Sequence, residues 1–236
     1  VSYYVKENDI IDVEAADRST SVYLVDRVVP MLPEILSNEI CSLKADVDRL
    51  CYSVILEMNE KSDIISHQIR KTIIHSDKRF TYQDAQDIID NKKGLFSDEL
   101  LILYKLSKIL RDKRFSSGSI NFDREEVKFI LDKDNNPTDV FFKESIDTNY
   151  LIEEFMLLTN KIVAKEIGFV KKGENPKTFV YRVHDKPDEQ KINSLNNIIK
   201  KFGYSINQTS PKNLSNSLNL LLKDAKGKSE SNMIET

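Results

Sequence analysis

The side chains that most often do chemistry are few in this sequence and fit no familiar catalytic spacing. His67, His75 and His184 form no HxxxH or similar ligand pattern, and Cys41 and Cys51 have no metal-binding spacing. The sequence holds no Ser/His/Asp nucleophile arrangement and no glycine-rich phosphate loop. We therefore assign these residues no metal, and we expect the cysteines to be small buried side chains in a reducing compartment.

A more informative feature is the segment of residues 20–50. It has no sustained apolar period of 3.6 or 2.0 residues, and Pro30 and Pro33 stand where a regular element would break. An aromatic residue, Tyr23, lies among its apolar and charged side chains. Loops of this kind often carry binding or catalytic residues. The segment therefore predicts an ordered loop at a functional site.

This segment and several others match one known family in the same order. The longest motif is SVYLVDRVVPMLPEILSNEICSL from Ser21, followed by DRL from Asp48. The other motifs are VSYYV at Val1, RFTYQDAQ at Arg79, KRFSSGSINFD at Lys113, VKFILDKDNNP at Val127, KESIDTNYLIEEFMLLTNKIVAKEIG from Lys143 and FVYRVHDKPDEQKI at Phe179. Together they resemble the catalytic (RNB) domain of ribonuclease R and ribonuclease II, hydrolytic exonucleases that degrade RNA from the 3′ end. The resemblance covers nearly the whole chain and implies an α+β fold of mixed sheet and helices.

The resemblance implies four RNA-binding residues, which are Tyr23, Tyr82, Phe122 and Glu153. The tyrosine that matches Tyr23 stacks at the 3′ end of the RNA, the aromatic that matches Phe122 lies at the other end of the stacked segment, and Tyr82 matches a channel-lining tyrosine. Flat rings suit such a channel, because every base has a π face and stacking tolerates any sequence. Each ring could instead pack in a core, and Tyr82 could begin a helix with its hydroxyl satisfied.

Glu153 lies almost opposite an apolar stripe of Leu151, Phe155 and Leu158 on a helical wheel. The resemblance implies that Glu153 faces the catalytic channel, while Glu154 flanks the stripe and is the weaker candidate. A solvated helix face is the alternative, because acidic residues near a helix start are also favoured by the helix dipole. Five arginines in the matched motifs could contact phosphates or form surface ion pairs: Arg27, Arg49, Arg79, Arg114 and Arg182.

The chemistry that the resemblance implies is two-metal hydrolysis, in which aspartates hold Mg²⁺ ions and nucleoside 5′-monophosphates are released. The family's aspartate cluster would lie upstream of Val1, and its TSPIRRYPD-like motif with the catalytic arginine would lie downstream of Thr236. Neither motif is in this sequence. We therefore expect residues 1–225 to be a partial RNB domain from the middle of a longer enzyme, with no catalytic or metal-binding residue of its own and no activity alone. We expect residues 226–236 to be a polar, frayed tail.

The expected partners are the 3′ end of single-stranded RNA and flanking cold-shock and S1 domains of the same protein. The net charge of −3 weighs against a self-sufficient RNA binder, because nucleic-acid affinity depends mostly on clustered Lys and Arg. With 40% hydrophobic and 31% charged residues and no apolar run near the roughly 20 residues of a spanning helix, the sequence is typical of a globular protein without membrane contact. We take the cytoplasm as the default location.

Local patterns predict the elements that position these residues. Two apolar runs, 50–58 and 64–74, separated by a polar stretch predict a hairpin, and a second hairpin is predicted around the turn at 132–137. Thr81 and Asp84 resemble a capping box for a short helix through Asp90, and helices are predicted from Ser97 and over 148–167. Two more helices are predicted, one beginning near Pro187 and one capped by Ser210 with Pro211 in first position, as a possible helical subregion after Gly168. Arg182 and His184 are predicted to alternate on one face of a strand.

Two alternatives to an active enzyme remain open at this stage. The chain could belong to a catalytically inactive relative that binds RNA or protein, or it could be a scaffold that keeps the family surface only for folding. Ser19, where the family has glycine in an RGTS motif, and Tyr4, where it has histidine in VSHYV, depart from the pattern.

Overall fold

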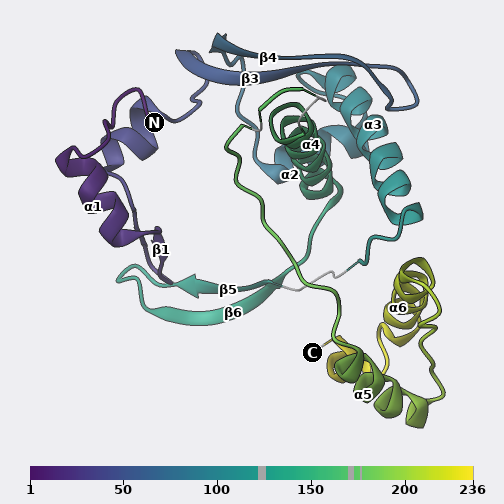
Figure 1. Ribbon diagram of the computed structural model, residues 1–236. Helices are drawn as coiled ribbons and strands as arrows, with labels where there is room; N and C mark the ends of the chain where they lie inside the picture. The colour runs from purple at the N-terminus through teal and green to yellow at the C-terminus, as the bar shows by residue number, and fades with distance from the viewer. Residues whose placement is uncertain (122–125, 170–172, 176, 236) are drawn as a thin grey trace.

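The structure, a computed structural model, describes residues 1–121, 126–169, 173–175 and 177–235 (Figure 1). The strands of this part of the chain pair into antiparallel two-stranded ribbons. They are β1 (Val22–Tyr23), β2 (Val28–Val29), β3 (Asp48–Met58), β4 (Ile64–His75), β5 (Glu126–Leu131) and β6 (Pro137–Lys143). The helices are α1 (Ile10–Arg18), α2 (Tyr82–Asn91), α3 (Ser97–Ser116), α4 (Asp147–Val163), α5 (Glu189–Ile199), α6 (Pro211–Ala225) and α7 (Ser231–Glu235), with π-helical turns η1 (Ile35–Ile40) and η2 (Ala164–Gly168) and a 3₁₀ turn η3 (Lys200–Phe202). This mixture of helices and small antiparallel sheets confirms the α+β class.

The β3–β4 hairpin confirms the first strand prediction and is slightly longer than predicted. Its register runs from Asp48 opposite His75 to a bulge at Glu57 and Met58. The Asn59 side-chain oxygen accepts from two backbone N–H groups in the turn, each at 2.9 Å, as a turn-favouring asparagine does. The Ser62 hydroxyl then donates to the Leu106 carbonyl at 3.0 Å. This bond attaches the turn of the β3–β4 hairpin to α3.

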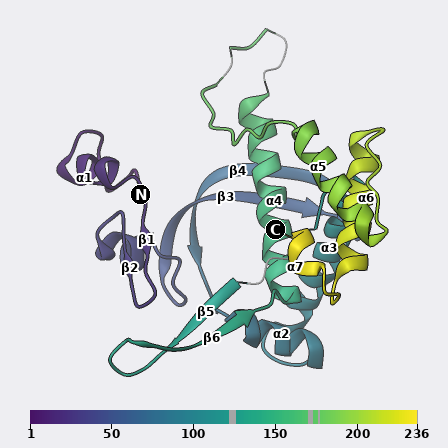
Figure 2. The ribbon, with the colours of Figure 1, turned by 90° about the horizontal axis from the view of Figure 1, so that it is seen from below.

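The predicted helix signals around α2, α3 and α4 are confirmed. Thr81 and Asp84 form the reciprocal capping box, in which the Thr81 hydroxyl accepts from the Asp84 N–H and the Asp84 carboxylate accepts from the Thr81 N–H. Helix α4 ends at Val163 and continues as the π-helical turn η2 to Gly168, where a side chain would collide with the Tyr181 ring. Helices α2, α3 and α4 contact one another. The β3–β4 ribbon crosses α4 in Figure 2.

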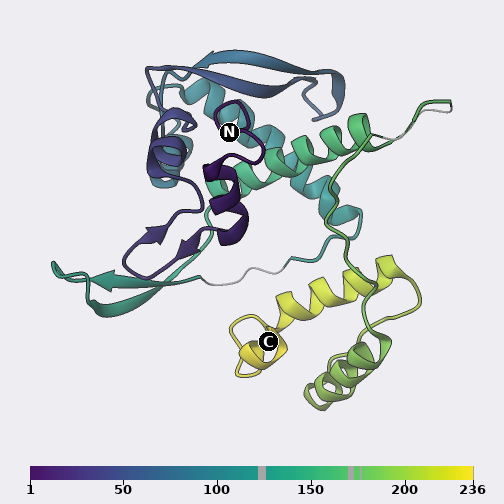
Figure 3. The same cartoon turned by 60° about the vertical axis from the view of Figure 1, so that its left-hand side comes forward.

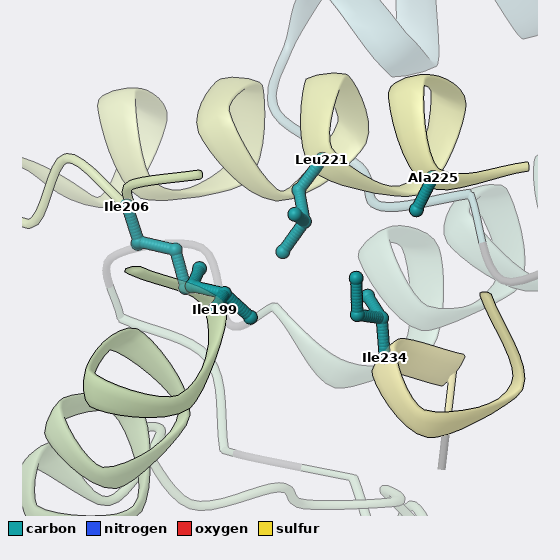
Figure 4. Close-up of a cluster of buried hydrophobic side chains, with 5 residues drawn as sticks. All are labelled: Ile199, Ile206, Leu221, Ala225 and Ile234. Atoms are coloured by element: carbon teal, nitrogen blue, oxygen red, sulfur yellow. The ribbon is translucent and has the colours of Figure 1, made fainter. Parts of the chain in front are cut away.

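The two helices predicted after Gly168 are present, and they share a small core of their own. Asp188 caps α5, and Ser210 caps α6 with Pro211 in its first turn. Five buried apolar residues meet between these helices: Ile199, Ile206, Leu221, Ala225 and Ile234 (Figure 4). Figure 3 shows these helices below the body formed by α2, α3 and α4, to which a long extended connection joins them.

Two local predictions are wrong. The tail beyond Lys226 was expected to fray, yet it forms α7 and buries Ile234 to 8% exposure against α5 and α6. The segment around Arg182 and His184 is not a strand: residues 177–188 have no regular structure, and Val183 is 82% exposed. A strand needs a hydrogen-bonding neighbour, and none pairs with this segment among the described residues. The domain boundary at residue 225 stays a prediction.

Candidate nucleic-acid interface

The Tyr23 ring is presented on the surface by a tight two-residue ladder. Tyr23 pairs with Val28 between β1 and β2, and the Leu24 N–H donates to the Arg27 carbonyl at 2.8 Å to close the turn. The Arg18 guanidinium and the Ser21 hydroxyl hold the next stretch through Pro30 and Met31. The Tyr23 side chain is left 79% exposed. The alternative of core packing therefore does not hold for this ring, and its face is open to a base.

The rest of the segment 20–50 is ordered by polar contacts instead of regular structure. The Arg49 guanidinium donates to the carbonyls of Ser42, at 3.0 Å, and Glu39, at 3.3 Å, and so fastens the π-helical turn η1 to the start of β3. The Lys44 ammonium pairs with the Glu39 carboxylate, and its hydrogen bond and charge lower the pKa of Glu39. The prediction of an ordered, non-repetitive loop is confirmed. Arg49 therefore has a structural role, because its guanidinium bonds to backbone carbonyls of the same segment.

Tyr82 lies at the mouth of an apolar cavity of about 410 Å³. The cavity is formed where α2, α3 and α4 meet, and its walls include Phe80, Leu103 and Leu151. The Tyr82 ring is 45% exposed, and the Lys143 ammonium lies 5.8 Å from its centroid, a cation–π distance. The Tyr82 carbonyl accepts from the Thr148 hydroxyl at 2.9 Å, which ties the start of α2 to α4. The ring is therefore half-buried and combines a packing role with an accessible face.

Glu153 and Glu154 take part in one ion-pair network that joins α4 to α3. Arg114 donates through Nε to both Glu154 carboxylate oxygens, at 3.0 and 3.2 Å, and through Nη2 to Glu153 at 2.9 Å. Arg111 adds longer contacts, with Nη1 at 3.8 Å from Glu153 and 3.7 Å from Glu154. The Glu153 side chain is 44% exposed, whereas the Glu154 side chain is 3% exposed. Glu153 therefore has one side against arginine and the other open, while Glu154 is wholly internal.

This network leaves Glu153 as the accessible glutamate of the two and makes Glu154 internal. The helical wheel placed Glu154 at the edge of the apolar stripe, and the structure shows that it lies on the buried face with Leu151 and Ile162. The burial of Arg114 by itself lowers the pKa of its guanidinium, but the hydrogen bonds and charges of Glu154 and Glu153 outweigh this, and the pKa of Arg114 is raised. Arg114 is thus an internal counter-ion in this structure.

Sequence reasoning missed Arg111 altogether. Its guanidinium lies 3.8 Å from the centroid of the Tyr150 ring and 4.9 Å from that of Phe115. Arg111 and Arg114 are three residues apart on α3 and so share a face opposite two consecutive glutamates of α4. That i, i+3 pair of arginines was the available signal, and it could be interpreted only once the two helices were known to be adjacent.

The structure brings together some of the predicted RNA-binding residues and not others. Tyr82 and Glu153 lie on α2 and α4, two helices that contact each other, although Glu153 does not line the cavity beside Tyr82. Tyr23 lies on a different part of the molecule, in the β1–β2 ribbon away from α2 (Figure 1). Phe122 lies outside the described residues.

The described residues contain neither a metal-binding cluster nor a helix that could span a membrane. In residues 1–121, 126–169, 173–175 and 177–235, no group of three or more His, Cys, Asp or Glu side chains is placed to hold a metal ion. The residues present therefore do not fit the Mg²⁺ that the resemblance implies. Across the same ranges, no helix combines the length and apolarity needed to cross a bilayer. Cys41 and Cys51 are free and half-buried.

Comparison with known proteins identifies similar chains. A family model described as the RNB domain matches residues 1–235. The chain is 40% identical over 203 residues to the exosome complex exonuclease dis3 of Schizosaccharomyces pombe, covering 85% of this chain and 20% of that protein. It is 36% identical to ribonuclease R 2 of Lactococcus lactis, covering 89% of this chain and 32% of that protein. The chain thus spans between a fifth and a third of these relatives.

Solved structures agree with the sequence comparison. The RNase R of Mycoplasma genitalium, solved in complex with ribose-methylated single-stranded RNA, superposes with a TM-score of 0.83 at 25% identity, over 99% of this chain and 37% of that one. Yeast Ssd1, described as a pseudonuclease, shares the fold with a TM-score of 0.72 at 17% identity, over 100% of this chain and 28% of that one.

Proposed function

This chain belongs to the RNB domain family, whose members include exoribonucleases, and we propose that it forms the central part of a ribonuclease R-like enzyme that degrades RNA from the 3′ end. The observation that carries the proposal is the exposed Tyr23 ring, 79% accessible on a ladder that fixes its backbone. A ring held in this way can stack on a terminal base without first being ordered.

In this proposal the chain supplies part of the RNA channel. Tyr23 stacks on the base at the 3′ end, Tyr82 lines the channel through its exposed face, and Glu153 presents one carboxylate edge to the strand while Arg114 holds the other. Phe122 supplies the second stacking ring. Backbone phosphates need cations as well, which the net charge of −3 does not supply overall. Flanking cold-shock and S1 domains of the same protein are the proposed source of that affinity.

The hydrolytic step is assigned to residues outside this chain. Mg²⁺ held by aspartates would activate water and stabilise the leaving 3′ oxygen, and the products would be nucleoside 5′-monophosphates. The described residues contribute binding and orientation of the RNA and no metal ligand set. A cytoplasmic location belongs to the same proposal.

An inactive RNA-binding or protein-interaction module is the second candidate. It is favoured by the fold shared with the pseudonuclease Ssd1 and by the departures from the family motif at Ser19 and Tyr4. The two candidates predict different behaviour toward RNA in the presence of Mg²⁺.

The experiment uses the longer protein that contains this chain and a single-stranded RNA labelled at its 5′ end. With Mg²⁺ we expect the labelled RNA to shorten stepwise from the 3′ end with release of nucleoside 5′-monophosphates, and with a chelator we expect intact RNA. Tight RNA binding without any shortening would favour the inactive module. A protein that neither binds nor shortens RNA would contradict the exonuclease and the RNA-binding module, and would leave only a protein-interaction module.

A further inference from the structure

A second cavity lies where the C-terminal end of α3 meets α6, away from the cavity beside Tyr82. Its volume is about 440 Å³. The views in Figures 1 and 2 agree that α6 lies next to the end of α3. The residues that matter for its chemistry are Arg111, Phe115, Asn121, Asn219, Lys223 and Lys226.

Two asparagines fix the walls of this cavity. The Asn219 side-chain oxygen accepts from the Asn121 N–H at 2.9 Å, and the Asn219 amide donates to the Ser119 carbonyl at 2.8 Å. Arg111 donates through Nη2 to the Asn121 side-chain oxygen at 3.2 Å. The two Asn219 bonds connect residues about 100 positions apart in the sequence, and they fasten α6 to the loop that follows α3. Hydrogen bonds within the protein therefore hold the walls of the cavity in place without a ligand.

The charge on the cavity wall is positive. Arg111, Lys223 and Lys226 line it, and no carboxylate belongs to the lining set. Arg111 shares its charge with Glu153 and Glu154 through Nη1, at 3.8 and 3.7 Å. Lys223 and Lys226 are exposed, and no ion pair to either is found among the described residues. They are three residues apart at the end of α6, so their ammonium groups share one face and repel each other until an anion lies between them.

The position of the cavity relates it to the RNA path. Asn121, in its wall, is the chain neighbour of Phe122, the ring that the family motif assigns to the end of the stacked RNA segment opposite Tyr23. The cavity wall is therefore one residue along the chain from a proposed RNA contact. Lysine ammonium groups are mobile point charges. They suit the phosphates of an RNA strand, which are the same whatever the base sequence.

We propose that the cavity between α3 and α6 binds a backbone phosphate of the RNA strand, on the side of the stacked segment away from the 3′ end. The proposal rests on the proposed function, since it takes RNA as the substrate. It goes beyond that function by assigning Lys223 and Lys226 as phosphate ligands.

The test measures equilibrium binding of a single-stranded homopolymer RNA to the longer protein that contains this chain, with a chelator present to prevent cleavage. The logarithm of affinity falls with the logarithm of salt by about 0.7 for each phosphate contact on a single strand. Replacing both lysines (Lys223→Gln with Lys226→Gln) should therefore reduce the slope by about 0.7, because the two lysines bind one phosphate. Over a rise from about 50 to about 200 mM NaCl, the wild type should lose about 2.6-fold more affinity than the double variant.

The matched control is Lys212→Gln, an exposed lysine in the first turn of the same helix that does not line the cavity. It makes the same charge change and should leave the slope at its wild-type value. Restoring charge with Lys223→Arg and Lys226→Arg should return the slope as well. All five changes are at three exposed lysines, so folding should be kept.

The outcomes separate this proposal from the function on which it rests. An unchanged slope in the double variant, in a protein that binds and shortens RNA normally, overturns the phosphate site alone. An unchanged slope together with weakened binding of polyglutamate would assign the cavity to an acidic protein and also overturn it. A wild-type protein that binds no RNA overturns the proposed function, and the phosphate site with it.

Discussion

Two side chains show how differently single residues serve this molecule: Tyr23 is 79% exposed on a two-residue ladder, and Glu154 is 3% exposed within an ion-pair network. Tyr23 contributes little to packing, so its effect should be on RNA and not on stability. Glu154 accepts three hydrogen bonds from one guanidinium. Its replacement should therefore affect stability and not RNA binding.

In the intact enzyme, Tyr23→Ala should weaken retention of the RNA 3′ end and leave longer end products, because a lost base stack costs roughly 1–3 kcal/mol. Product lengths on a denaturing gel measure this. Tyr52→Ala is the control, since Tyr52 is 69% exposed and lies outside the matched motifs. Equal product lengths for both variants and wild type would count against the stacking role.

Glu154→Ala should weaken the α3–α4 contact by about 3–5 kcal/mol, because it leaves the Arg114 charge buried without its main partner. Hydrogen exchange of the α3 and α4 amides in the longer protein measures the local opening free energy. Glu14→Ala is the control, since the Glu14–Arg18 pair is exposed and should contribute less than about 1 kcal/mol. The double change Glu154→Leu with Arg114→Leu should cost less than Glu154→Ala, since it removes both charges; a greater loss would contradict the argument.

At the scale of elements, local hydrogen bonds decide where helices and strands begin and end. The capping box at Thr81 starts α2, and a charged pair closes the open end of the β3–β4 hairpin, where His75 Nδ1 lies 2.8 Å from the Asp48 carboxylate. Both features join residues that are close in the chain or opposite each other in one ribbon. Each can therefore be tested without disturbing the rest of the fold.

Thr81→Ala should destabilise the first turn of α2 by about 1 kcal/mol, because the Asp84 N–H loses its acceptor, the Thr81 hydroxyl. Hydrogen exchange at the start of α2 should speed up, while Thr81→Ser should keep the wild-type rate because it retains the hydroxyl. If Thr81→Ala and Thr81→Ser exchanged alike, the cap would have no part in the stability of α2.

The hairpin end should depend on pH through His75. The Asp48 hydrogen bond, aided by nearby carboxylates, raises the pKa of His75 above its ordinary value. A raised folded-state pKa means that the contribution of this pair is fully present below the unfolded value of about 6.5 and is lost as pH rises through the folded value. An NMR titration of His75 should show its pKa fall in Asp48→Asn, and an unaltered pKa would exclude the pair as the cause.

At the scale of the whole molecule, this chain exposes far more surface than its size requires. Its accessible area is 18264 Å², whereas a compact monomer of 27.3 kDa is expected to expose about 11,000 Å². Much of the excess is apolar. Phe129, Val140 and Phe142 on the β5–β6 ribbon are 46%, 48% and 61% exposed, and Leu50, Tyr52 and Ile73 on the β3–β4 ribbon are 63%, 69% and 68% exposed. Two-stranded ribbons of this kind are marginal by themselves.

The isolated chain of residues 1–236 should therefore bind a hydrophobic dye such as ANS strongly. It should also self-associate, because association removes the exposed apolar surface of the ribbons from water. It should also release no nucleotide from RNA with Mg²⁺. Dye fluorescence, size-exclusion chromatography and a nucleotide release assay measure the three effects, with the longer protein as control. A monomeric chain that binds no dye would refute the surface argument, and Mg²⁺-dependent nucleotide release would refute the assignment of hydrolysis to residues outside it.

The sequence by itself determined the long helices, the two long hairpins and the family. The caps at Thr81 and Ser210, the apolar periods of α3 and α4 and the turn residues of both long hairpins act over a few neighbouring positions, so they can be recognised before folding. The tertiary structure decided what is buried. It paired Arg114 with Glu154 across 40 positions, left Tyr23 open, gave Arg182 and His184 no strand partner, and buried Ile234 in a tail that looked polar. Burial depends on which distant segments meet, and local patterns carry no information about that meeting.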